Sequence, residues 1–253
     1  MTVRTSQRLP HLPGDWAMSR RDATSLDCYY RCMADAKAWG RLHTLAAGQF
    51  GLFTAAQARH HGVPRYELAR RAAAGELFRA HHGVYGFTED SAGMFTFEDW
   101  AAQWLALRPE DDIERRRVDP DCVLSHDSAA VIRELGTIVA RGLFLTGPRR
   151  INTRSPRVHT YRRDIGARGV DWDVVEGLPV ATPGRIIADL ARDDLDGAHQ
   201  GTVIADVLDS GLLTIDEVGA RLDPFAHRWD EPHGVALAHR FLAAAGRPSC
   251  LPA

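Results

Sequence analysis

The sequence predicts an α+β protein in which a small, mostly helical N-terminal part with one β-hairpin precedes a mixed α/β C-terminal part. Closely spaced helix start and stop signals occupy residues 39–87, whereas short strand-like and helical segments share residues 121–246. The two parts also differ in charge. Residues 1–88 hold 12 Lys and Arg against 6 Asp and Glu, and residues 89–253 hold 19 against 27. The 253-residue length, with 45% hydrophobic residues, is enough for two domains.

The first 38 residues are expected to be a disordered leader. They hold prolines and scattered charges without sustained periodicity. Met33 is an alternative start, because helical periodicity begins shortly after it. A first helix is then predicted, ending at Gly48, with one apolar face formed by Trp39, Leu42 and Leu45.

Two helices joined by a short turn follow. Thr54 and Gln57 have the spacing of a capping box, which predicts a helix that ends at Gly62. Pro64 suits the first position of a second helix, which runs to about Ala74. This succession is the layout of a helix-turn-helix.

A β-hairpin is predicted directly after the second helix. Its strands run from Leu77 to Ala80 and from Val84 to Phe87, around a His81-His82-Gly83 turn. Such a hairpin is the wing of a winged helix-turn-helix, so we expect a winged helix-turn-helix DNA-binding domain over residues 39–92.

The second helix is expected to have an apolar face and a DNA-binding face. Its apolar side, turned to the core, is formed by Val63, Leu68 and Ala72. In this motif the start of the second helix meets base edges in the major groove, where arginine can contact guanine. The residues predicted to bind DNA are Thr54, Gln57, Arg65, Tyr66, Arg70, Arg79, His81 and His82. The alternative is a small helical subdomain that binds protein.

The charge distribution favours double-stranded DNA as the partner of the N-terminal part. Its basic excess suits the neutralisation of phosphates, whereas the acidic C-terminal part is better suited to a protein partner. No apolar run approaches the length of a membrane span, and the N-terminus lacks the apolar segment of a signal peptide. We therefore expect a cytoplasmic protein that contacts no membrane.

The remaining chain is expected to form a bridge and a second domain. Residues 93–120 should hold a bridging helix from Phe97 to Leu107 and a charged loop from Pro109 to Asp121. Residues 121–246 should form the mixed α/β domain. Its strands are expected within 122–124, 143–146, 157–162, 170–175 and 178–180, and its helices over 126–135, after 182, after 198, after 214 and over 235–245.

Three motifs occur in order along the chain: GVY at residues 83–85, LSHDSAA at 124–130 and GLPVATPGRIIADLA at 177–191. Together they resemble the AbiEi-type antitoxins of type IV abortive-infection toxin–antitoxin systems, over about residues 40–222. The resemblance implies a repressor whose winged helix binds the operator of its own operon. It also implies a C-terminal domain that counters a nucleotidyltransferase-like toxin without needing a stable complex.

The resemblance also bears on individual residues. It places Arg65, Tyr66 and Arg70 toward the bases, and Arg79, His81 and His82 on the wing. In the C-terminal domain it carries over the motif residues Ser125, His126, Arg185 and Asp189 without assigning them a role. Glu76 departs from the pattern, since a basic residue would suit DNA better. Proteins with this front end also occur as orphan regulators without a toxin, which is the first alternative.

A DNA-processing enzyme is the second alternative, and the sequence argues against it. A restriction-like nuclease core needs a lysine beside its acidic metal ligands, but Lys37 is the only lysine in the chain. The consecutive His126, Asp127 and Ser128 suit a helix start better than a catalytic triad. Arg185 and Asp189 have the spacing of a structural ion pair on one helix.

No cofactor or metal is expected. The four cysteines show no zinc-binding spacing and should be free thiols, although a site formed by Cys28, Cys32 and His43 is left open. We therefore expect a regulator and not an enzyme.

Overall fold

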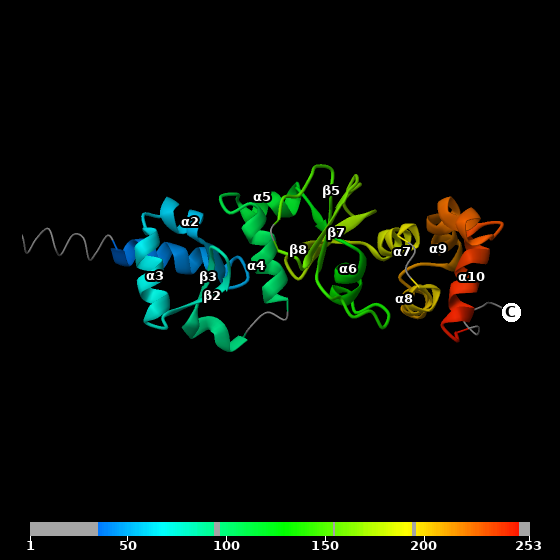
Figure 1. Ribbon diagram of the computed structural model, residues 1–253, viewed down its shortest axis with the longest axis horizontal. Coiled ribbons are helices and arrows are strands. Elements are labelled where there is room, and N and C mark those ends of the chain that lie inside the picture. The colour runs from blue at the N-terminus through cyan, green and yellow to red at the C-terminus, as the bar shows by residue number, and fades with distance from the viewer. Residues whose placement is uncertain (1–34, 94–96, 154, 194–195, 248–253) are drawn as a thin grey trace, which may run out of the picture.

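The computed structural model describes residues 35–93, 97–153, 155–193 and 196–247. The molecule is elongated, and its parts follow one another along the long axis in sequence order (Figure 1). Helices and two separate β-sheets confirm the α+β class. The leader predicted over residues 1–38, with Met33, lies almost wholly outside the described residues.

The N-terminal part contains three helical segments and a small sheet. Residues 35–47 are helical. The later elements are β1 (Leu52–Thr54), α2 (Ala55–His60), α3 (Arg65–Ala73), β2 (Leu77–His81) and β3 (Val84–Phe87). The antiparallel sheet has the order β1-β3-β2. The helices and hairpin lie where the sequence predicts them, but β1 was not predicted, because three residues are too few to show a strand periodicity.

Local signals explain how this part folds. Thr54 and Gln57 form both hydrogen bonds of the predicted capping box at the start of α2. Gly62 ends the turn with a φ of 86°, a left-handed conformation that glycine adopts without strain. The prediction that Pro64 occupies the first helical position was wrong. Pro64 is the N-cap of α3, in an extended conformation that its ring and the following helix both allow.

A compact core holds the N-terminal part together. Leu68 is fully buried and Val63 is 3% exposed, as the predicted apolar face requires. They pack with Leu42 of the first helix and with Phe53 and Tyr85 of the sheet. The exposed face of α3 is thus fixed by the burial of its opposite side.

Helix α4 (Glu98–Leu107) forms where the sequence predicts a helix after the hairpin. It packs against β1, β2 and β3, and Leu52 and Val84 of the small sheet belong to the larger, C-terminal core together with Trp104. The small sheet therefore contributes to both cores.

The charged segment after α4 is not simply a loop, and this prediction was wrong. It contains α5 (Ile113–Val118), with Asp112 as its capping residue. Ile113 and Arg116 of this helix are buried. A single buried apolar residue, Ile113, in a six-residue helix leaves no periodic pattern in the sequence.

The C-terminal part is built on a five-stranded mixed sheet of order β6-β5-β4-β8-β7. Its strands are β4 (Val123–Leu124), β5 (Leu143–Gly147), β6 (Val158–Arg162), β7 (Trp172–Val175) and β8 (Leu178–Ala181). The β4–β8 and β5–β6 pairs are parallel, and the other pairs are antiparallel. Leu124, Leu145 and Val180 are buried at the centre of this sheet.

Helices complete the C-terminal part and form its far end (Figure 1). They are α6 (His126–Ile132), α7 (Pro183–Arg192), α8 (Gly197–Asp209), α9 (Ile215–Leu222) and α10 (Gly234–Ala244). The helix predicted over 126–135 is shorter, because Glu134 and Gly136 adopt positive φ angles. Within the described part of the chain, no helix combines the length and apolarity needed to cross a bilayer.

Candidate nucleic-acid interface

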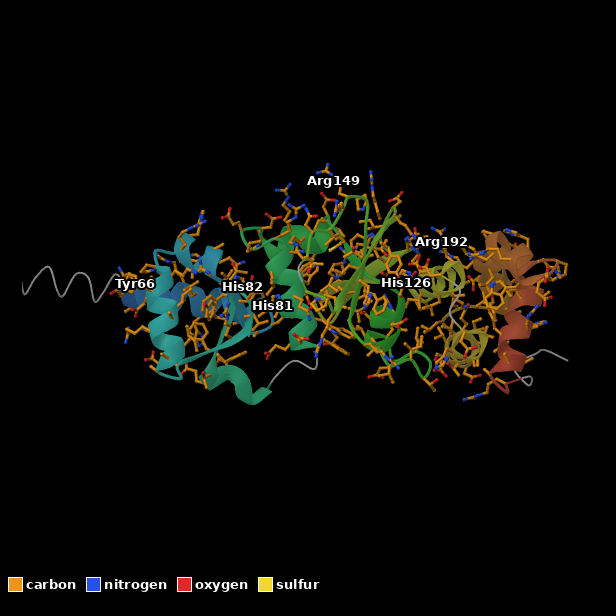
Figure 2. The ribbon with its side chains drawn as sticks, viewed as in Figure 1. Tyr66, His81, His82, His126, Arg149 and Arg192 are labelled. Carbon is orange, nitrogen blue, oxygen red and sulfur yellow. The ribbon has the colours of Figure 1, made fainter. Side chains whose placement is uncertain are left out.

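The outer face of α3 presents three of the predicted DNA-binding side chains. Arg65, Tyr66 and Arg70 are exposed, and Tyr66 is 74% exposed, which is unusual for an aromatic side chain. Tyr66 lies at the outer end of the N-terminal part (Figure 2). Among the described residues, Arg65 forms no ion pair or hydrogen bond through its guanidinium. Arg65 and Tyr66 are therefore available to a ligand at the start of this helix.

Arg70 differs from Arg65, because Glu67 holds it. Its Nε lies 2.9 Å and its Nη2 lies 2.6 Å from the two carboxylate oxygens of Glu67. The hydrogen bond from Arg70 keeps the pKa of Glu67 below its usual value, so the carboxylate stays charged. Glu67 thus engages two of the three guanidinium nitrogens of Arg70, Nε and Nη2.

The hairpin carries the other predicted contacts, but away from Tyr66. His81 and His82 lie toward the middle of the molecule, close to α4 (Figure 2). The Nη2 of Arg79 lies 2.8 Å from Nδ1 of His82. Burial lowers the pKa of His81, against an opposing effect of Asp99 in α4. The structure thus groups Arg79, His81 and His82 with each other rather than with the start of α3.

Thr54 and Gln57 have a structural role, and the prediction that Thr54 contacts DNA is corrected here. Thr54 is fully buried, and its hydroxyl accepts from the backbone N–H of Gln57 and donates to the carbonyl of Pro109. The Gln57 carboxamide bonds to the Thr54 backbone and to Gln49. These bonds hold the start of α2 in place, and a buried hydroxyl cannot reach DNA.

The four C-terminal motif residues converge on one partly buried network. His126 is 2% exposed, and its Nε2 lies 2.6 Å from Asp193, whereas its Nδ1 lies 2.8 Å from the hydroxyl of Ser125. Arg185 pairs with the buried Asp189 at 2.9 Å, which confirms the predicted ion pair. Arg163 joins the two halves, since it bonds to Asp193 at 2.6 Å and lies 3.8 Å from Asp189.

Arg163, Asp193 and Tyr161 belong to this network but were missed by sequence reasoning. The Tyr161 ring stacks on His126 with the ring centroids 4.0 Å apart, and Arg163 lies over the Tyr161 ring. Tyr161 and Arg163 lie in and just after an edge strand, and Asp193 follows α7. The order β6-β5-β4 brings them to the start of α6, so only the topology could reveal them.

The network has the groups of a hydrolytic triad but not its accessibility. Burial lowers the pKa of His126 despite the neighbouring carboxylates. Burial alone would raise the pKa of Asp193, but hydrogen bonds from Arg163 and His126 hold it below its usual value. A neutral His126 thus donates through Nε2 to a charged Asp193 and accepts from Ser125. Ser125 is fully buried and also bonds to Thr146, so its hydroxyl faces protein groups rather than a substrate.

The thiol and metal expectations can be examined for part of the chain. Cys122 is a buried free thiol, and burial raises its pKa to about 12, so it stays protonated. Cys28, Cys32 and Cys250 lie outside the described residues, so that His43 is the one member of the suggested site that the structure describes. Over the residues that the structure covers, no group of three or more His, Cys, Asp or Glu has metal-binding geometry.

The N-terminal part of the chain matches a known protein family. Residues 41–88 match a family model described as "Transcriptional regulator, AbiEi antitoxin". The resemblance predicted from the sequence is confirmed over these residues, which extend from the first helix to the end of the hairpin. No curated protein matches the chain.

A solved structure matches most of the chain in fold. It is the crystal structure of the RV2827C protein from Mycobacterium tuberculosis, with a TM-score of 0.50 and 15% sequence identity. The match covers 86% of this chain and 79% of that chain. At this identity the likeness shows a related fold alone.

Proposed function

We propose that this protein is a DNA-binding transcriptional repressor of the antitoxin type, with a winged helix-turn-helix over residues 39–92. One observation carries the proposal: the segment that matches the regulator family model presents Arg65 and Tyr66, exposed, at the start of its second helix. Helix starts of this kind are placed in the major groove by helix-turn-helix proteins. Strands β2 and β3 pair as an antiparallel hairpin within the small sheet, which supports the assignment of Arg79, His81 and His82 to a short wing.

In this proposal Arg65 and Tyr66 contact the DNA at the centre of the interface. Arg65 donates to a guanine or a phosphate, and the Tyr66 hydroxyl holds the backbone. Arg70 joins after it leaves Glu67. The bridging helix and linker occupy residues 93–120, and the α/β domain over residues 121–246 takes no direct part in reading bases.

The same proposal makes the operator of its own operon the DNA target, so that the protein regulates itself. The C-terminal domain counteracts a nucleotidyltransferase-like toxin, without a stable complex. Its acidic charge suits a protein target better than DNA. An orphan regulator without a toxin is the second candidate, favoured by the limited extent of the family match. A toxin gene beside this one, whose toxicity the protein suppresses on co-expression, separates the two.

Binding to the DNA upstream of the gene, compared with scrambled DNA across a salt series, tests the proposal. We expect selective binding whose affinity falls steeply with salt, because phosphate contacts release counterions. Equal, weak binding to both DNAs would leave the N-terminal part as a protein-interaction domain.

A further inference from the structure

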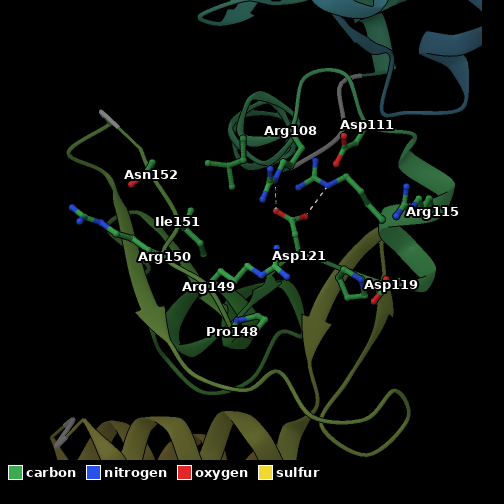
Figure 3. Close-up of a pocket in the computed structure, with 13 residues that line it drawn as sticks. Arg108, Asp111, Arg115, Asp119, Asp121, Pro148, Arg149, Arg150, Ile151 and Asn152 are labelled. Carbon is green, nitrogen blue, oxygen red and sulfur yellow. Dashed lines mark hydrogen bonds and ion pairs between the residues drawn. The ribbon is translucent and has the colours of Figure 1, made fainter.

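A cavity rich in arginine lies in the C-terminal part, apart from α3. It has a volume of ≈ 530 Å³ and lies between the end of α4, α5 and the loop after β5. Such a volume is in the range of small-molecule sites. Its charged lining consists of Arg108, Arg115, Arg116, Arg149 and Arg150 together with Asp111, Asp119 and Asp121. Since Arg150 points away from the cavity (Figure 3), four arginines lie against three aspartates, and the cavity keeps an excess of one positive charge.

The arginines of the cavity are only partly neutralised. Asp121 accepts from Arg116 at 2.9 Å and lies 3.5 Å from Arg108, so one carboxylate serves two guanidinium groups. Among the described residues, Arg115 and Arg149 form no ion pair through their side chains. Figure 3 shows Arg149 extending into the cavity beside Asp121, whereas Arg150 points away from it.

Arg116 is the buried arginine of the cavity, and its guanidinium is held in place by neighbouring groups. Its side chain is 3% exposed, its guanidinium lies 3.7 Å from the centre of the Trp104 ring, and its Nη1 donates to the Trp104 carbonyl. Its Nη2 is buried with no hydrogen-bond partner among the described residues. A buried, unsatisfied donor on an arginine is rare in folded proteins, and here it lies beside a site where further arginines converge.

We propose that this cavity binds a small molecule bearing a diphosphate group, of the nucleoside diphosphate class. A diphosphate carries two to three negative charges, which Arg115 and Arg149, without an ion pair among the described residues, can neutralise in part. Arginine binds phosphate oxygens through two N–H groups of its guanidinium at once. The guanidinium groups of Arg115 and Arg149 have no ion-pair partner among the described residues and can bind in this way. Asp111, Asp119 and Asn152 supply polar groups that suit a sugar or a base.

Concavity and the mixed lining favour a small ligand over the DNA backbone. Asp111 and Asp119 are exposed at the cavity and would repel the continuous phosphate rows of a duplex. Tyr66, at the proposed DNA-binding face, lies at the outer end of the N-terminal part, whereas Arg149 lies in the C-terminal part (Figure 2). The inference is therefore independent of the proposed DNA binding.

Calorimetric titration of the full chain with pyrophosphate and with ADP tests this inference. We expect both to bind at one site, each to displace the other, and Arg149→Gln to weaken both by about tenfold, since one charge-assisted contact is lost. Arg149 is exposed on a loop, so the fold should survive. The matched control is Arg141→Gln, an exposed arginine outside the cavity, which should leave binding unchanged.

Three results would overturn the inference. The first is an absence of pyrophosphate binding to the intact protein. The second is an equal loss in Arg149→Gln and Arg141→Gln, which would indicate diffuse charge attraction. The third is displacement of bound ADP by a duplex of scrambled sequence, which would make these arginines part of a DNA-binding surface.

Discussion

At the residue scale, the ion pair between Glu67 and Arg70 limits the basic character of α3. Replacing Glu67 by Gln removes the carboxylate that accepts from two guanidinium nitrogens of Arg70, Nε and Nη2. We expect Glu67→Gln to tighten DNA binding a few-fold on operator and scrambled DNA alike. If Arg70 then gains a phosphate, the slope of log K against log salt should steepen by about 0.9.

The matched control for this change is Glu76→Gln, which removes one of the two carboxylates paired with Arg71 and leaves the pair of Arg70 intact. Arg71 also bonds to Glu67 and lies over the Trp39 ring, so it should remain in place and DNA binding should change little. An unchanged or weaker affinity in Glu67→Gln, measured by fluorescence anisotropy, would show that Arg70 does not face the DNA.

His81 provides a second residue-scale prediction, concerning pH. Burial lowers the pKa of His81 below the ordinary histidine value of about 6.5, so His81 is neutral at neutral pH. It gains its proton at a lower pH than an exposed histidine does. A protonated His81 attracts phosphate, so DNA affinity should rise as pH falls from 6.5 toward 5. His81→Gln should flatten this rise, with circular dichroism checking that the fold persists. A rise of the same size in His81→Gln would assign the effect to another group.

At the element scale, the sequence predicted the helices with strong end signals and missed those without them. The capping boxes at Thr54 and Thr214 mark the starts of α2 and α9 correctly. Strand β1 and helix α5 were not predicted, because tertiary contacts stabilise each of them. Strand β1 pairs with β3, and α5 is anchored by its buried Arg116. Local propensity cannot show contacts between distant segments.

The candidate site, like the helices, could be predicted from the sequence only where local patterns determine it. The exposed positions of Arg65, Tyr66 and Arg70 follow from helical periodicity, and the structure confirms that they are exposed. Two features were beyond the sequence. The pairing of Arg70 with Glu67 depends on side-chain conformations, and the burial of Thr54 depends on contact with the bridging segment at Pro109.

The partly buried network at α7 gives an element-scale prediction about stability. Asp189 is 1% exposed, pairs with Arg185, and lies near Arg163. Asp189→Asn should lower the free energy of unfolding by about 3–5 kcal/mol, because it leaves the mostly buried Arg185 without a carboxylate partner, although Arg163 keeps Asp193. Asp209→Asn, which alters an exposed pair with Arg247, should cost less than about 1 kcal/mol. Equal effects in urea denaturation would contradict a role for the network in holding α7.

At the scale of the whole molecule, the two parts should unfold together. Leu52 and Val84 of the small sheet pack into the C-terminal core, and Arg117 bonds to the carbonyls of both Gly48 and Gly177. We expect fluorescence and far-ultraviolet circular dichroism to report one coincident urea transition. Two separate transitions would show that α4 does not couple the parts.

The central claim is that the start of α3 reads a DNA sequence. The most direct measurement is the affinity of the wild type and of Arg65→Ala for the upstream DNA and for scrambled DNA, at one fixed salt concentration. We expect Arg65→Ala to lose about 1–3 kcal/mol on the upstream DNA and much less on the scrambled DNA, so that sequence preference falls. An equal loss on both DNAs, or no loss on either, would contradict the placement of α3 in the major groove.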